Sequence, residues 1–248
     1  MFRHCTVFVS VFILCIYSAN AAEFILQSNF GWPLWIGIQG NGGFPALENG
    51  GLELQPGERR SVYSDDSWEG RFWARTGCNW DNNWCETGDC GGNGPQCEGH
   101  HGERPASLAE IAKNQWLGLD FYDISLVDGS NIPISMEPIG VQGDGSRYFC
   151  TKAQCGHDFN SDCPEELKLY RGADNRVVGC MSACTKYGTD EYCCEGVYNA
   201  KGNCRPNEWP VNYAAFFYDR CPDAYSYAQD DETSMFSCRA NTYLITFG

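Results

Sequence analysis

The stretch Cys85-Glu86-Thr87-Gly88-Asp89-Cys90, which continues to Cys97, is the most informative part of the chain. It is too short and too polar to form a helix or a buried strand. Glycine adopts backbone conformations that other residues avoid, and Thr and Asp hydrogen-bond to their own backbone in turns. Cysteines at positions 85, 90 and 97 therefore predict a tight loop that is held covalently.

The first 21 residues have the pattern of a secretory signal peptide. A basic start is followed by an apolar run from Val7 to Tyr17, too short to span a bilayer, and by a small-x-small site at residues 19–21. We expect cleavage after Ala21 and a secreted, extracellular protein of residues 22–248. No other stretch is apolar enough for an anchor, so no stable membrane insertion is expected.

The cysteine count fits an oxidising compartment. Of the 16 cysteines, Cys5 and Cys15 leave with the signal peptide, and 14 remain. An even number in an exported chain predicts complete pairing into seven disulfides. Metal binding is the competing use of cysteine, but only His100, His101 and His157 remain to assist and no CxxC…CxxC spacing occurs. We expect neither a metal nor another cofactor.

The chain is strongly acidic, with 32 Asp+Glu against 17 Lys+Arg and a net charge of −15. This charge repels nucleic acid and anionic lipid surfaces, so neither is expected as a partner. A neutral polymer such as a polysaccharide, or a cationic partner, is favoured. The alternative is an acidic surface that only keeps the protein soluble.

The first half of the exported chain has the pattern of short strands. Apolar, β-rich or alternating segments are separated by turns rich in Gly, Asn, Asp and Pro, and another strand-like run closes the chain. Many short strands with such turns predict a β-sandwich or barrel. The strand segments are residues 24–26, 34–38, 52–54, 71–75, 120–127 and 242–247.

The middle of the chain is different, because residues 150–221 contain nine of the 14 remaining cysteines. Two short helices are expected there: one with Cys180 and Cys184 on one face, and one over residues 207–220 that begins at an Asn cap. The core of such a lobe is small, so disulfides are expected to hold it, at ~2–4 kcal/mol each. The adjacent cysteines 193 and 194 should join two different loops.

Several blocks resemble one family, in order along nearly the whole exported chain. The segment from Cys85 to Cys97 is similar to the signature of thaumatin-like, pathogenesis-related proteins. Similar blocks are residues 73–78, 108–110, 120–129, 191–194 and 221–227. The resemblance implies a mainly β fold: a thaumatin-like β-sandwich with a disulfide-rich lobe of loops and short helices, and a small disulfide-braced hairpin region.

The resemblance also implies boundaries within one domain over residues 22–248. The sandwich core would comprise about 22–75, 106–156 and 222–248, the hairpin region about 76–105, and the lobe about 157–221. Residues 106–113 would form a strand, although residues 107–110 also match a helix capping box. The implied disulfides are Cys78–Cys85, Cys90–Cys97, Cys150–Cys238, Cys155–Cys221, Cys163–Cys180, Cys184–Cys193 and Cys194–Cys204.

One bridge that is common in the family has no counterpart here. It ties the N-terminal strand to the C-terminal tail, and its positions fall near Phe30-Gly31 and at the end of this chain, where neither cysteine is present. No thiol is left without a partner. We therefore expect the two termini to be less constrained. The stabilisation that is missing is about that of one disulfide.

The family commonly has a cleft lined by one Arg and four acidic residues. The matching positions are Arg71, Glu110, Asp123, Asp128 and Asp223. Clustered carboxylates repel one another and raise the pKa of one of them, and glycosidic bond cleavage needs a protonated acid beside an ionised partner. Glu110 is the expected general acid and Asp123 or Asp128 the base or nucleophile.

The remaining candidates would bind the substrate. Arg71 and Asp223 would position it, and the aromatic rings of Phe121 and Tyr122 would contact sugar faces; Phe217 and Tyr227 lie in nearby blocks. Each polar position also has a structural interpretation. Arg71 can form an ordinary ion pair on a strand, Asp128 precedes Gly129 and can shape a turn, and Asp223 follows Pro222 and can cap the next segment.

The resemblance implies a secreted, monomeric, antifungal defence protein that meets β-1,3-glucan or another cell-wall polysaccharide. Three activities stay open from the sequence. The protein is a weak endo-β-1,3-glucanase, a glucan-binding protein without catalysis, or an inhibitor of a foreign hydrolase.

Overall fold

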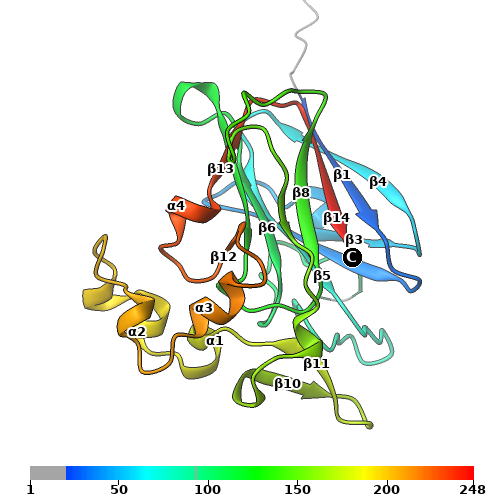
Figure 1. The fold of residues 1–248 in the computed structure, drawn as a ribbon. Coiled ribbons are helices and arrows are strands. Elements are labelled where there is room, and N and C mark those ends of the chain that lie inside the picture. Colours follow the sequence, from blue (N-terminus) through cyan, green and yellow to red (C-terminus); the bar gives the residue numbers. More distant parts are fainter. Residues whose placement is uncertain (1–20, 93) are drawn as a thin grey trace, which may run out of the picture.

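Two β-sheets pack face to face in this protein (Figure 1). The structure is a computed structural model that describes residues 21–92 and 94–248, so most of the expected signal peptide lies outside the described residues. The first sheet has the order β4-β1-β14-β8-β9, with bounds Arg59–Asp65, Ala21–Ser28, Thr242–Phe247, Ile134–Ile139 and Ala153–Cys155. The second has the order β12-β7-β6-β5-β2-β3, with bounds Ala224–Tyr225, Asp120–Ser125, Leu108–Ala112, Glu69–Arg75, Leu34–Gly40 and Gly51–Leu54; β13 (Phe236–Cys238) also pairs with β7.

Alternating side chains build the core between the two sheets. In β1, Phe24 and Leu26 are buried while their neighbours along the strand are partly exposed, as expected for a sheet with one buried face. Aromatic rings then meet across the sandwich: Phe24 lies 5.0 Å from Phe72, and Tyr122 lies 5.3 Å from Tyr243, measured between ring centroids. The predicted mainly β sandwich is confirmed.

The strand-like run 242–247 forms a strand, as predicted, and the structure places it at the centre of its sheet. β14 pairs in parallel with β1 and antiparallel with β8. Where the family's additional bridge is missing, contacts without a covalent bond join the ends. The Asn29 side-chain amide donates to the Gly248 carbonyl at 2.9 Å, and the Phe30 ring lies so close to Gly248 that a Cβ there would fall 2.9 Å from it.

The motif from Cys85 to Cys97 is a scaffold. Gly88 has a φ of +65°, in the left-handed region that favours glycine, and its carbonyl accepts a hydrogen bond from the Trp73 indole at 2.9 Å. The Thr87 hydroxyl contacts that of Thr76 at 2.7 Å. These bonds dock the hairpin region onto β5. The ambiguous segment 106–113 contains β6, so the strand implied by the resemblance is confirmed and the capping box is not used.

Disulfides hold the lobe of loops and short helices, and all seven bridges pair as the resemblance implied. The adjacent Cys193 and Cys194 join two different partners, Cys184 and Cys204.

The remaining elements are η1 (Leu47–Gly50), η2 (Trp116–Gly118), η3 (Phe159–Ser161), η4 (Glu165–Leu167), β10 (Lys168–Arg171), β11 (Arg176–Cys180), α1 (Ala183–Tyr187), α2 (Asp190–Cys193), η5 (Gly196–Tyr198), η6 (Pro206–Glu208), α3 (Tyr213–Tyr218) and α4 (Asp231–Ser234).

Both helices expected in the lobe differ from the prediction. Cys180 ends β11 while Cys184 lies in α1, so they do not share a helix. The second helix is shorter than 207–220, because Pro210 disfavours a helical residue before it and has no N–H to donate. The cap is therefore Asn212, whose side chain accepts a hydrogen bond from the backbone N–H three residues later at 3.0 Å.

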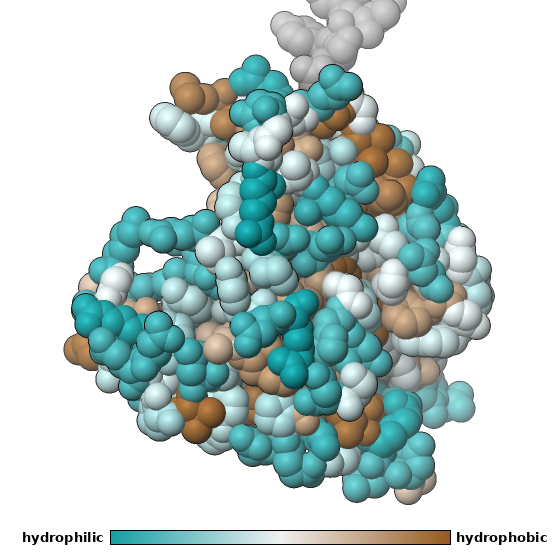
Figure 2. Space-filling model, in the orientation of Figure 1, coloured by the Kyte–Doolittle hydropathy of each residue, from teal (hydrophilic) through white to brown (hydrophobic). Residues whose placement is uncertain are grey.

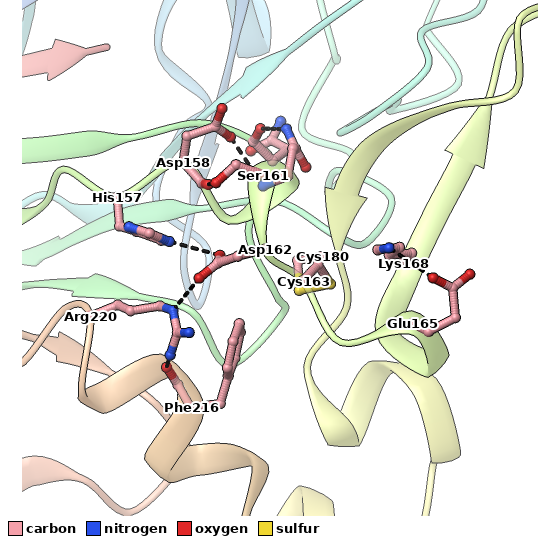
Figure 3. Close-up of a disulfide and its surroundings, with 12 residues drawn as sticks. His157, Asp158, Ser161, Asp162, Cys163, Glu165, Lys168, Cys180, Phe216 and Arg220 are labelled. Atoms are coloured by element: carbon pink, nitrogen blue, oxygen red, sulfur yellow. Dashed lines mark hydrogen bonds and ion pairs between the residues drawn. A yellow bond between two sulfur atoms is a disulfide. The ribbon is translucent and has the colours of Figure 1, made fainter.

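An ion cluster joins two segments of the lobe next to the Cys163–Cys180 bridge (Figure 3). Asp162 accepts hydrogen bonds from His157 at 2.8 Å and from Arg220 at 2.7 Å. The Arg220 guanidinium also lies over the Phe216 ring, 3.9 Å from its centroid.

Within the described residues, no helix is long and apolar enough to cross a membrane.

A buried ion pair joins the two sheets. Lys113 follows β6 and donates to Asp120 at the start of β7 at 2.7 Å, and their side chains are only 1% and 4% exposed. Asp120 also accepts a hydrogen bond from the Tyr243 hydroxyl of β14 at 2.7 Å, and Lys113 donates to the carbonyl of Ala240. Because these partners come from both sheets, the cluster fixes the β6–β7 ribbon against β14.

We predict that Lys113→Met lowers the free energy of unfolding by roughly 3–5 kcal/mol, because it leaves the Asp120 carboxylate buried without its cation. Urea unfolding followed by fluorescence measures this. Lys152→Met, at an exposed lysine outside the cluster, should change stability by less than about 0.5 kcal/mol. Equal unfolding midpoints for the two variants would contradict the prediction.

Candidate functional site

Three charged side chains lie in one row across three neighbouring strands. The antiparallel registers pair Arg71 of β5 with Glu110 of β6, and Glu110 with Asp123 of β7. Directly opposed residues have Cβ atoms about 4.5–5.5 Å apart, and like charges in that position destabilise a sheet. The strand pairing therefore forces two carboxyl groups together beside one guanidinium.

The row lies in a cavity of about 420 Å³ on the outer face of the second sheet. Figure 2 shows the molecule indented on this side, between the lobe that carries α2 and the upper end of the sheets. The cavity is lined by both polar and apolar side chains. Its lining is Asn41, Arg71, Leu108, Glu110, Ile111, Ala112, Phe121, Asp123, Ser125, Val127, Asp128, Tyr225, Ala228, Asp231 and Met235.

Each acid of the cavity has a different environment. Arg71 approaches Glu110 at 3.3 Å, and the Glu110 side chain is 25% exposed. Asp128 forms an ion pair with Arg104 at 2.7 Å. Asp123 is buried, and its Oδ1 atom has no hydrogen-bond partner among the described residues. An unpartnered buried oxygen is costly when the carboxyl group is ionised.

Burial and mutual repulsion raise the pKa values of these acids. The pKa of Asp123 lies well above its ordinary value, first because of burial and then because of the nearby Glu110. Burial also raises the pKa of Glu110, which Arg71 opposes, and that of Asp128, which Arg104 opposes. We infer that Asp123 keeps its proton to the highest pH, while Arg71 stabilises the ionised form of Glu110.

The structure brings together most of the expected site. Arg71, Glu110, Asp123, Asp128 and the ring of Phe121 all line the cavity. Asp128 also begins the turn at Gly129, whose φ is +96°, so its structural interpretation holds beside the functional one.

Asp223 and Tyr122 do not belong to the cavity. Asp223 forms an ion pair with the half-exposed Arg147 at 2.9 Å. Tyr122 is fully buried and donates to the Thr151 carbonyl. Successive strand residues face opposite sides, so a strand that points Phe121 and Asp123 into the cavity must point Tyr122 into the core. That alternation could have been applied to the sequence.

One acid of the cavity was not among the predicted residues. Asp231, the first residue of α4, occupies the place expected of Asp223, and it accepts a hydrogen bond from the Tyr225 hydroxyl at 2.8 Å. The acids Asp223, Asp230 and Asp231 all follow Cys221 closely, and spacing alone does not say which of them turns toward the cavity.

Of the other expected aromatics, Phe217 is buried in the core. No group of three or more His, Cys, Asp or Glu side chains could hold a metal ion in the part of the chain described.

Comparison with known proteins identifies the family. Residues 29–248 match the model of the Thaumatin family. The chain belongs to the thaumatin family. Pathogenesis-related protein 5 of Arabidopsis thaliana is 44% identical over 240 residues, covering 96% of this chain and 94% of that protein.

Two further comparisons concern glucan enzymes. A Prunus avium protein named glucan endo-1,3-beta-glucosidase is 40% identical over 243 residues, covering 96% of this chain and 95% of the relative. A solved structure of a GH family 64 laminaripentaose-producing beta-1,3-glucanase from Paenibacillus barengoltzii, complexed with laminarihexaose, has a TM-score of 0.57 at 13% identity. It covers 93% of this chain and 76% of the glucanase, and it shows similarity of fold alone.

We predict that Asp123→Asn stabilises the protein at pH 7. A raised pKa means that the folded state binds this proton more tightly than the unfolded chain does, so stability falls as pH rises between the two pKa values. The neutral amide of the variant removes that loss of stability. It also removes the repulsion between this position and the Glu110 carboxylate. Each kcal/mol gained should raise Tm by about 2–4 °C.

Thermal unfolding at a series of pH values tests this prediction. The advantage of the variant should shrink as pH falls toward ~3, where the carboxyl group is mostly protonated in both states of the wild type. The matched control is Glu195→Gln, at an exposed acid of the lobe outside the cavity. A variant less stable than wild type at every pH would show that Asp123 is held by favourable contacts instead.

Proposed function

We propose that this protein is a secreted, antifungal defence protein that binds β-1,3-glucan of cell walls in the cavity between β5–β7 and α4. The observation that carries the proposal is the row of Arg71, Glu110 and Asp123 inside a cavity large enough for sugar residues. The Prunus avium relative named glucan endo-1,3-beta-glucosidase, 40% identical over almost the whole chain, supports the same substrate class.

The lining of the cavity suits a neutral polyhydroxyl chain. Arg71 offers N–H donors, and its Nε atom has no partner among the described residues. Glu110 and Asp128 offer acceptors for sugar hydroxyl groups. Apolar walls from Phe121 and Met235 match the C–H faces of sugar rings. An uncharged ligand also avoids the repulsion that this acidic protein exerts on anionic polymers.

Hydrolysis of the bound glucan is a second candidate function, favoured by the paired carboxyl groups. Cleavage needs one protonated and one ionised carboxyl group. The environments support Asp123 as the proton donor and Glu110 as the carboxylate, the reverse of the roles expected from sequence, since Arg71 contacts Glu110 while Asp123 is buried without a cation in contact. Asp123 would protonate the glycosidic oxygen as its bond to the anomeric carbon breaks. Glu110 would attack that carbon or deprotonate the attacking water.

We expect laminarin to bind the wild-type protein and Arg71→Gln to weaken that binding, because the guanidinium donors are lost from the cavity. Pull-down on insoluble β-1,3-glucan and calorimetric titration with laminarin measure the effect. Glu195→Gln should bind as the wild type does. If neither titration nor pull-down detects glucan binding by the wild type, the proposed function is wrong, and inhibition of a foreign hydrolase becomes the interpretation to pursue.

A reducing-sugar assay on laminarin separates binding from hydrolysis. If the protein is an enzyme, Asp123→Asn should lower the rate by about 10²–10⁴-fold while glucan binding persists, because the amide cannot donate the proton to the leaving group. The rate should fall as pH rises through the raised pKa of Asp123 and fall again when acid protonates Glu110. A wild type that binds laminarin and releases no reducing sugar would leave a binding protein without catalysis.

A further inference from the structure

A second cavity adjoins the first on the far side of Asp231. It has a volume of about 600 Å³ and lies between two loops, one in the lobe near η5 and one that leads into α4. Asp231 lines both cavities, so the start of α4 separates them. The lining of the second cavity is Asn199, Lys201, Gly202, Cys204, Tyr227, Gln229, Asp230, Asp231, Glu232 and Thr233.

One aromatic ring in this second cavity is fixed and partly open. Tyr227 is partly exposed, and its ring packs against the buried Trp209 in an edge-on arrangement, with centroids 6.1 Å apart. Among the described residues, the Tyr227 hydroxyl has no hydrogen-bond partner. A ring already held in place loses little conformational entropy when a ligand packs on it.

Two charged side chains beside the ring are also free. Lys201 and Glu232 are exposed, and neither side chain forms a hydrogen bond or ion pair with any residue that the structure describes. Asp230, by contrast, is already used, because it accepts hydrogen bonds from the Ser226 hydroxyl and the Thr233 hydroxyl at 2.8 and 2.7 Å. The groups available to a ligand are therefore Lys201, Glu232, amides and an aromatic ring, beside Asp230 and Asp231, which already accept hydrogen bonds.

The cavity keeps its shape because its two loops are tied together. The Gln229 side-chain amide donates to the backbone carbonyls of Tyr198 and Asn199, at 3.1 Å each. The other end of the same amide, its Oε1 atom, is buried with no partner among the described residues. The two hydrogen bonds of Gln229 join the lobe to the loop before α4. A ligand would therefore meet a preformed surface.

We propose that this second cavity is a subsite for the same glucan chain, which passes from the row of Arg71, Glu110 and Asp123 over Asp231 and onto the ring of Tyr227. The inference rests on the proposed function. A neutral polyhydroxyl chain matches the lining, since its hydroxyl groups can accept from Lys201 and donate to Glu232 while a ring face packs on the tyrosine. The protein then selects long chains over short ones, because only a long chain occupies both cavities.

Calorimetric titration with laminari-oligosaccharides, from the disaccharide to the hexasaccharide, tests the subsite. Affinity of the wild type should rise along the series as the chain reaches Tyr227. Tyr227→Ala and Lys201→Ala should each weaken binding of the hexasaccharide by about two- to tenfold, in the range of single aromatic contacts, and leave the disaccharide unchanged. Tyr227→Phe should retain most of the affinity, because it keeps the ring.

Matched controls separate the subsite from general effects. Tyr63→Ala and Lys152→Ala remove an exposed tyrosine and an exposed lysine that line neither cavity, and both should titrate as the wild type does. Lys201 is at the surface, so its variant tests the proposal even if Tyr227→Ala loosens the packing on Trp209. Equal wild-type affinity for short and long chains, or long-chain binding that is unaffected by both variants, would overturn the subsite alone. Failure of every chain length to bind would overturn the proposed function together with it.

Discussion

The buried ion pair of Lys113 and Asp120 is the interaction on which the arrangement of the site depends. It lies where β6 turns into β7, and it reaches the other sheet through Tyr243 and Ala240. A charged pair removed from water is stable only when its remaining donors and acceptors are satisfied. Asp120 meets that condition with four partners, which include the backbone N–H groups of Asn114 and Ala240. The β6–β7 ribbon is thus fixed against the sandwich before any ligand arrives.

The same ribbon carries an arrangement that works against stability. Its register places Glu110 opposite Asp123, although like charges on facing strands repel. Only one guanidinium, that of Arg71, stands in the same row, and it contacts Glu110. The proposed hydrolysis would use this arrangement, because it needs one protonated and one ionised carboxyl group beside each other. The rigid ribbon holds the two carboxyl groups together despite their repulsion.

Covalent bonds play the corresponding part in the lobe. Its helices have four to six residues, too few to be stable in isolation, and the bridges Cys184–Cys193 and Cys194–Cys204 fix loops that have little core beneath them. The second cavity lies against these loops. Disulfides there do more than compensate for a small core, because they hold the surface that faces α4 in a fixed shape.

The sequence by itself determined the sandwich, the complete pairing of the cysteines and four of the five polar positions of the cleft. Those results follow from the strand pattern of apolar and polar residues, from the cysteine count and from sequence blocks that resemble the family. Only the tertiary structure decided that Asp231, and not Asp223, closes the cavity, because three nearby acids in one short segment differ only in which way the chain turns. It also decided how strongly the pKa of Asp123 is raised. That depends on burial and on the position of Arg71, which the strand register sets and which no short stretch of sequence contains.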